Sequence, residues 1–157
     1  MVAIDFFNLV DDIDWADMPV KQTYSKYLWH DGGSLGDAPV DMAATFAGGM
    51  QISTKIDRSF NQNGLRCSPN FTVPRHHHNI PELIIVLKGE FTIEFGDDDN
   101  LQRQRVIAGG QFISQPGTPY TMIAGPDGVT YIETWPEPMV TLETVWYDHG
   151  WVSRSPQ

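Results

Sequence analysis

The chain has a single cysteine, Cys67, among its 157 residues. An internal disulfide is therefore excluded, and this low cysteine use fits a reducing compartment. No apolar run approaches the roughly 20 residues that a membrane-spanning helix needs. The first residues also lack the basic segment, apolar segment and small-residue cleavage site of a secretory signal. We therefore predict a soluble protein located in the cytoplasm.

Positive charge is also scarce, since 10 Lys and Arg stand against 20 Asp and Glu, for a net charge of −10. Such a chain repels phosphate backbones, and no basic cluster is interleaved with aromatic residues. We expect neither nucleic acid nor an anionic membrane as a partner. The acidic runs at 11–14 and 97–99 lack the spaced oxygen ligands and central glycine of a calcium loop, and we interpret them as solvated turns.

The hydrophobic pattern is that of a β-protein built from many short strands. Residues 91–95 alternate apolar and polar side chains, as a half-buried strand does. Frequent Gly and Pro between such runs favour a sandwich or barrel over βαβ units. We predict turns at 61–64 and 88–90. We predict strands at 22–29, 71–78, 82–87, 91–95, 103–107, 111–114, 120–123 and 129–135, with one or two more within 43–56.

The segment Arg75-His-His-His-Asn-Ile-Pro-Glu82 contains the strongest chemical signal. In an extended chain, His76 and His78 point to one face and can grip one ion. A proline at position 81 interrupts the strand and lets Glu82 return toward the same ion. Two imidazoles and one carboxylate form a facial ligand set with open positions for substrate, water or dioxygen. Three histidines can also be a solvent-exposed polar run or part of a tag, but the spacing to Glu82 favours metal.

This spacing resembles the first conserved motif of the cupin superfamily: His76-x-His78, three residues, Glu82, six residues and Gly89. The leading glycine of that motif is replaced by Asn70. The second cupin motif is similar to the segment from Gly109 to Tyr120, with Gln115 where proline is usual. The resemblance implies an all-β double-stranded β-helix, the cupin or jelly-roll barrel, with one divalent metal ion inside it.

Tyr120 stands where the resemblance places a third histidine ligand. A phenol has a pKa near 10, so it is a poor ligand unless the metal lowers that value, but it is a good hydrogen-bond donor or general acid. Three roles stay open for Tyr120: metal ligand, donor beside the metal, and packing at the barrel mouth. His30 or His149 is an alternative source of the missing imidazole. We therefore predict His76, His78, Glu82 and Tyr120 as metal-site residues, with Glu82 and Tyr120 also catalytic.

Alternation along the strands predicts a mainly apolar pocket around the site. Thr72 and Pro74 share the face of His76, and Ile84 and Val86 share the face of Glu82. Arg75 and His77 should point away, unless a bulge shifts the register. The remaining walls are expected from Phe112 or Gln111, the strand that ends at Trp135, and Trp146-Tyr147. Such a pocket suits an aromatic or otherwise hydrophobic small molecule.

We predict one cupin domain over residues 1–157. Residues 1–20 form an N-terminal extension, 66–135 the barrel core, and 136–157 a tail that packs on the barrel. The tail from 141 to 152 is rich in aromatic residues and is expected to cover a sheet edge. By analogy with similar proteins, we expect a homodimer formed through barrel edges.

Three functions fit these residues. The favoured one is a non-haem Fe(II) dioxygenase that cleaves a carbon–carbon bond of a small aromatic or carbonyl-containing molecule. The second is a redox-neutral isomerase, lyase or hydrolase in which Zn(II), Mn(II) or Ni(II) polarises a carbonyl and Tyr120 transfers a proton. The third is a non-catalytic, ligand-binding cupin, which the missing third histidine favours.

Overall fold

The computed structural model describes residues 4, 6–11, 14–18, 26–29, 35–36, 46–56, 58–147 and 151–154. Its regular elements are almost entirely β-strands, with three 3₁₀ turns: η1 (Arg58–Phe60), η2 (Asp98–Asn100) and η3 (Met139–Thr141). The strands are β1 (Trp15–Asp17), β2 (Lys26–Trp29), β3 (Leu35–Gly36), β4 (Met50–Ser53), β5 (Gln62–Cys67), β6 (Thr72–His78), β7 (Glu82–Phe95), β8 (Gln102–Ile107), β9 (Gln111–Ser114), β10 (Tyr120–Thr134), β11 (Glu143–Trp146) and β12 (Trp151–Arg154). All strand pairings in this part of the chain are antiparallel.

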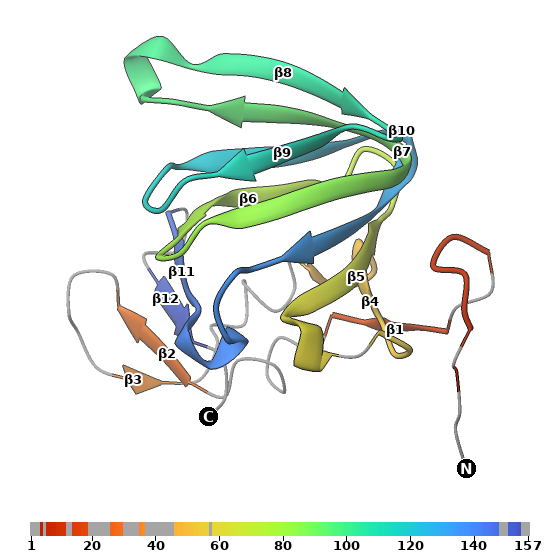
Figure 1. Cartoon of the computed structure of the whole chain (residues 1–157). Coiled ribbons are helices and arrows are strands. Elements are labelled where there is room, and N and C mark those ends of the chain that lie inside the picture. The colour runs from red at the N-terminus through yellow and green to blue at the C-terminus, as the bar shows by residue number, and fades with distance from the viewer. Residues whose placement is uncertain are drawn as a thin grey trace.

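Two long strands, β7 and β10, organise the fold. The first half of β7 pairs with the second half of β10, and β9 and β5 flank this pair. The second half of β7 pairs with the first half of β10, and β8 and β6 flank that pair. Figure 1 shows β7 and β10 turning together at one side of the molecule, so that the two halves of the sheet face each other. The fold is thus the predicted all-β double-stranded β-helix of the cupin type.

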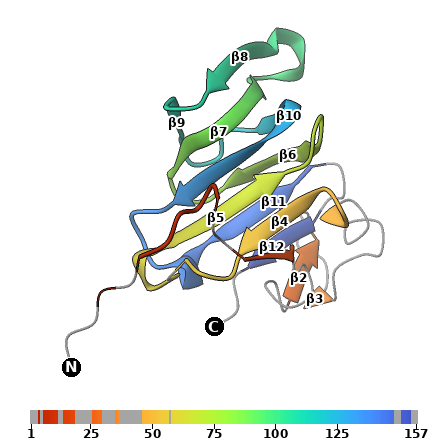
Figure 2. The same cartoon turned by 90° about the vertical axis from the view of Figure 1, so that its right-hand side faces the viewer.

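Further strands extend both halves of the sheet. β11 pairs with β6 on one side, followed by β12, β2 and β3, while β4 and β1 continue outward from β5. Figure 2 shows β8 and β3 at opposite ends of this curled sheet. The tail is therefore more than a cover over an edge, because β11 is itself hydrogen-bonded to the edge of β6.

The predicted turn at 88–90 is wrong, because β7 runs through it as a bent strand. Gly89 has a φ of +74°, which only glycine adopts without strain, and its backbone lies against Gly128 in the matching bend of β10. The strands predicted at 120–123 and 129–135 are likewise one strand, with a register shift between Ala124 and Val129. From the sequence, a bend within a strand that stays paired with its neighbouring strands resembles a turn.

The predicted turn at 61–64 is wrong apart from its first residue, since Gln62 begins β5. Asn63 and Gly64 are poor strand formers, but β5 lies between β4 and β10 and its backbone groups pair on both sides. Gly64 also allows close packing, because a Cβ there would lie 2.7 Å from Leu9. Tertiary pairing overrides local preference at this segment.

The interior between the two half-sheets is apolar at one end and polar at the other. Leu65, Ile84, Val86 and Phe91 are completely buried in the apolar core. Burying each such side chain contributes roughly 1.5–3 kcal/mol to folding. Polar residues that are also buried include His76, His78, Glu82, Ser114, Thr144 and Asn63.

Candidate functional site

Three strands bring the predicted site residues together inside the barrel. β6 carries His76 and His78, β7 begins at Glu82, and β10 begins at Tyr120. All four side chains are buried, with exposed fractions of 1–7%. Residues Asn79 to Pro81 separate β6 from β7, as expected for a segment that contains proline. Glu82 therefore returns to the interior opposite the two histidines.

Each histidine is oriented through its Nδ1 atom. Nδ1 of His76 lies 2.7 Å from the carbonyl oxygen of Pro74, and Nδ1 of His78 lies 2.9 Å from Oγ1 of Thr144. A carbonyl only accepts, so His76 carries its proton on Nδ1 and presents a lone pair on Nε2. Burial, followed by the neighbouring His78, lowers the pKa of His76 from 6.5 to about 3. His76 is therefore neutral at physiological pH.

Glu82 is the acceptor at the centre of the site. Tyr120 donates its hydroxyl to Oε2, and Ser114 Oγ lies 3.5 Å from the same atom. The other oxygen, Oε1, lies 3.3 Å from Nε2 of His78 but has no partner with hydrogen-bond geometry. Burial by itself raises the pKa of Glu82, but His78 and the Tyr120 hydroxyl outweigh it and hold the pKa below its usual value. The carboxylate is thus ionised.

Tyr120 lies between the histidines and the pocket described below. Its ring centroid is 4.4 Å from that of His76, and its hydroxyl donates to Glu82. Burial and then the negative charge of Glu82 raise the pKa of Tyr120 well above 10. The phenol is therefore a protonated donor in this arrangement.

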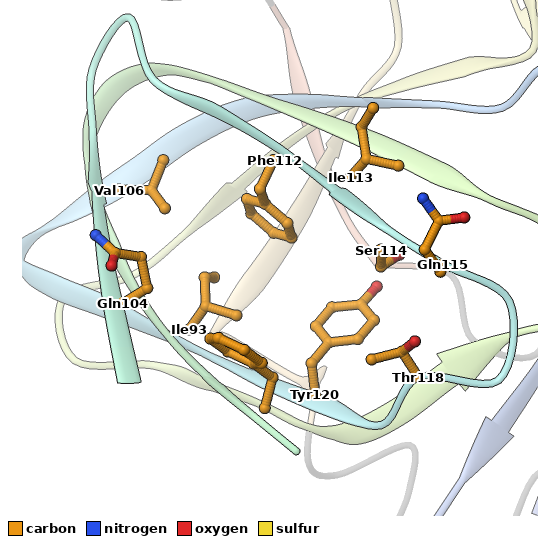
Figure 3. A pocket seen from close by; sticks show the side chains of 10 residues that line it. Ile93, Gln104, Val106, Phe112, Ile113, Ser114, Gln115, Thr118 and Tyr120 are labelled. Atoms are coloured by element: carbon orange, nitrogen blue, oxygen red, sulfur yellow. The ribbon is translucent and has the colours of Figure 1, made fainter. Parts of the chain in front are cut away.

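An apolar pocket of about 380 Å³ adjoins Tyr120. Figure 3 shows the Tyr120 ring among the lining side chains, with its hydroxyl toward Ser114. The pocket connects to Glu82 through these two residues, because both lie against its carboxylate. The lining residues come from β7, β8, β9, the segment before β10 and the first residue of β10: Ile93, Phe95, Gln104, Val106, Phe112, Ile113, Ser114, Gln115, Thr118 and Tyr120.

A second pocket of about 340 Å³ lies beside Glu82 on another side. Leu83, Ile113 and Trp135 line it, together with Thr134 and prolines 81 and 136. Glu82 thus lies between two pockets, one of which it lines directly and one of which it reaches through Tyr120 and Ser114.

Most of the expected walls are in place, but one face assignment is wrong. Ile84 and Val86 are fully buried, and Trp146 stacks near His76 at a centroid distance of 4.8 Å. Thr72 is exposed and Val73 is buried instead. The register between β6 and β10 shifts between the pairs His76–Tyr120 and Val73–Met122, which reverses the faces before Pro74.

The structure places the other side chains that were considered for the pocket walls either at the pocket or away from it. Phe112, rather than the exposed Gln111, lines the pocket. Arg75 donates to the Gly96 carbonyl and His77 contacts the Tyr147 hydroxyl, so both point away from the site. Tyr147 therefore lies outside the site. His30 and His149 lie outside the described residues.

Sequence reasoning missed four polar residues. Ser114 and Thr144 contact Glu82 and His78 respectively, and both are buried. Asn63 and Glu133 form a hydrogen-bonded pair on the same inner face of the barrel. Only Glu133 left a sequence signal, as an acidic residue inside the predicted strand 129–135.

Within the described ranges, no group of three or more His, Cys, Asp or Glu side chains is arranged so that it could hold a metal ion. The same part of the chain contains no helix with the length and apolar character needed to cross a membrane.

The sequence matches no family model, and no curated protein matches it. Among solved structures, the fold is similar to oxalate decarboxylase from Bacillus subtilis, with 16% identity, a TM-score of 0.48, and coverage of 57% of this chain and 25% of that one. It is also similar to vicilin from Corylus avellana, with 19% identity, a TM-score of 0.48, and coverage of 62% of this chain and 31% of the vicilin chain.

A third similar structure is the cupin domain of CENP-C from Drosophila melanogaster, with 16% identity, a TM-score of 0.43, and coverage of 54% of this chain and 65% of the CENP-C chain. The chain spans about a quarter of the decarboxylase and a third of the vicilin chain. These similarities carry no argument about function.

Proposed function

We propose that the chain is a metal-dependent enzyme of the cupin type that acts on a small, mainly apolar molecule. The observation that carries this proposal is the enclosure of two histidines, an ionised glutamate and a protonated tyrosine beside an apolar pocket of about 380 Å³. Burying polar groups of this kind costs free energy unless each is paired. Clusters of such groups are found at functional sites.

The donor atoms are of types that bind divalent ions, although no three of the described His and Glu side chains are placed for coordination as they stand. His76 offers the lone pair of Nε2, and both histidines are oriented through Nδ1 in the manner of metal-bound imidazoles. Oε1 of Glu82 is a buried acceptor without a hydrogen bond. His76, His78 and Glu82 would hold the ion, and binding requires Glu82 to turn from its present neighbours. The hydrogen bond that the Tyr120 hydroxyl donates to Glu82 supports a role for Tyr120 as a hydrogen-bond donor beside the ion.

The pocket supports a hydrophobic substrate. Isoleucine, valine and phenylalanine make up half of its lining residues, and the Tyr120 ring adds further apolar surface. Ser114, Thr118 and two glutamines add polar groups. An aromatic or aliphatic body would pack against the apolar wall, and a carbonyl group would point toward Tyr120 and Glu82. Once Glu82 turns toward the ion, the Tyr120 hydroxyl is free to donate its one hydrogen bond to that carbonyl instead of to Glu82. Ser114 can orient Glu82.

The proposed reaction is oxygen-dependent cleavage of a carbon–carbon bond next to a carbonyl. When bound, Fe(II) supplies the redox chemistry with dioxygen and open positions for a chelating substrate. Each product fragment takes one oxygen atom, so no external reductant is required. The protein's own residues orient the substrate, exclude water through the apolar wall, and hold a proton on Tyr120.

The test is elemental analysis of protein purified without a His-tag or chelator. We expect about one equivalent of metal in the wild type and none in His76→Ala/His78→Ala, since two ligands are removed. His77→Ala is the matched control, because this neighbouring histidine points away from the site. Metal-free wild-type protein that stays empty after reconstitution would refute the proposal and favour a non-catalytic, ligand-binding cupin.

A redox-neutral reaction is the second candidate, and the protonated, buried Tyr120 next to Glu82 favours it. In that case Zn(II), Mn(II) or Ni(II) supplies Lewis-acid chemistry and Tyr120 donates a proton to the substrate. Turnover that persists without oxygen and after replacement of iron by zinc would select this reaction over the dioxygenase.

A further inference from the structure

Glu133 faces the same interior as the proposed metal ligands. In the β-ladder it pairs with Ile84 of β7 on one side and with Asn63 of β5 on the other. Directly paired residues point to the same face of a sheet. Ile84 is completely buried and Asn63 is 2% exposed, so this face is the inner one. Glu133 itself is half-buried.

Glu82 and Glu133 are diagonal neighbours on adjacent strands. Glu82 lies two residues before Ile84 on β7, and Ile84 is paired with Glu133. Diagonal neighbours in an antiparallel ladder have Cα atoms roughly 7–8 Å apart, within reach of long side chains. Two carboxylates therefore enter the polar end of the barrel from neighbouring strands.

Asn63 holds Glu133 and adds another oxygen. Its Nδ2 donates to Oε1 of Glu133 over 2.8 Å, which fixes the orientation of the amide. Its Oδ1 is buried and has no hydrogen-bond partner among the described residues, as is also true of Oε1 of Glu82. A buried acceptor left without a donor is destabilising, and a bound ion or water is the usual explanation.

The electrostatics of a neighbouring hydroxyl agree with this geometry. Burial raises the pKa of Tyr131 well above its usual value, and the charges of Glu133 and Glu82 both add to the effect. Tyr131 is fully buried on the inner face of β10, two residues before Glu133. Both carboxylates thus lie near one interior hydroxyl.

We propose that Glu133, positioned by Asn63, is a second carboxylate ligand of the metal ion held by His76, His78 and Glu82. This inference rests on the metal site of the proposed function. A divalent ion would neutralise both carboxylates. A donor set rich in carboxylate oxygen suits Mn(II) and Fe(II), whereas additional nitrogen donors favour later ions.

The experiment is a titration of the metal-free full-length chain with Mn(II), in which free Mn(II) is measured by electron paramagnetic resonance. We expect Glu133→Gln to weaken Mn(II) binding at least tenfold, because a charged ligand becomes a neutral one of the same shape. Asn63→Leu, which removes the positioning amide at similar volume, should weaken it less. Glu137→Gln is the control, because Glu137 is exposed and lies four residues further on.

The outcomes separate the two proposals. If the wild type binds Mn(II) and His76→Ala/His78→Ala does not, but Glu133→Gln binds as tightly as Glu137→Gln, then only the role of Glu133 is overturned. If the wild type binds neither Mn(II) nor Fe(II), both proposals fail. Thermal unfolding of each metal-free variant shows whether a loss of binding reflects a loss of fold.

Discussion

The two ring nitrogens of His76 have different neighbours, and this difference defines its chemistry. Nδ1 donates to a backbone carbonyl, which leaves the lone pair of Nε2 for a ligand. Its low pKa, caused mainly by burial, means that metal need not compete with a proton at neutral pH. Both features suit His76 to bind the metal ion in the proposed site.

Tyr120 provides the sharpest test at the scale of one residue. Tyr120→His introduces the imidazole that the cupin motif has at this position, and we expect metal affinity to rise by about tenfold or more, ~1.4 kcal/mol. The gain should come from an additional nitrogen ligand to the ion that His76, His78 and Glu82 hold. Isothermal titration with Co(II) or Zn(II) measures it.

Tyr120→Phe is the control for this substitution, because it removes the hydroxyl without adding a ligand. It should not raise the affinity. A fall in affinity for Tyr120→His would show that the phenol itself binds the metal better than an imidazole can at this position.

At the scale of elements, the bends in β7 and β10 join the two half-sheets. Gly89 has a left-handed backbone, and a Cβ at that position would lie 2.1 Å from the carbonyl oxygen of Gly128. No side chain can be accommodated there without moving one bend against the other. The bends bring Glu82 of one half-sheet toward Tyr120 and the histidines of the other.

Gly89→Ala should therefore destabilise the fold more than Gly117→Ala does. Both glycines have φ near +73°, but a Cβ at Gly117 meets nothing within 4 Å. The left-handed backbone costs each alanine roughly 1–2 kcal/mol, and the clash adds about 1–3 kcal/mol at Gly89. Urea unfolding of both variants measures the difference, and equal free energies of unfolding would contradict the role of this contact.

At the scale of the whole molecule, polar groups gather at one end of an otherwise apolar interior. If His76, His78 and Glu82 hold an ion only in the folded chain, the ion stabilises that chain. At a free metal concentration of 100 times Kd, the free energy of unfolding rises by about 2.7 kcal/mol. For a chain of this size, that gain raises Tm by roughly 5–10 °C.

Scanning calorimetry of protein with and without Fe(II) or Mn(II), followed by a chelator, checks this expectation. The rise in Tm should vanish on chelation and be absent in His76→Ala/His78→Ala, while His77→Ala keeps it. A rise of the same size in the double variant would place the ion elsewhere. The predicted homodimer remains a prediction, and light scattering measures it directly.

Much of the fold was predictable because alternation and Gly-Pro punctuation are local signals. They located β6, β8 and β9 to within a residue and indicated an all-β barrel. The bent passages at 88–90 and 125–128 were not recognised as strand, because bends that keep their ladder partners are indistinguishable from turns in one sequence. Asn63-Gly64 was misread because its strand structure depends on pairing with β4 and β10.

The sequence predicted the candidate site residues, because the spacing of His76, His78 and Glu82 is a local pattern that can be recognised without knowing what lies beside it. Tertiary structure alone decided what surrounds them. Tyr120 meets Glu82 because two bent strands bring the half-sheets together, and Glu133 meets Asn63 because β5 and β10 are paired. Such contacts join residues 38 and 70 positions apart, so they depend on strand register and not on any local pattern.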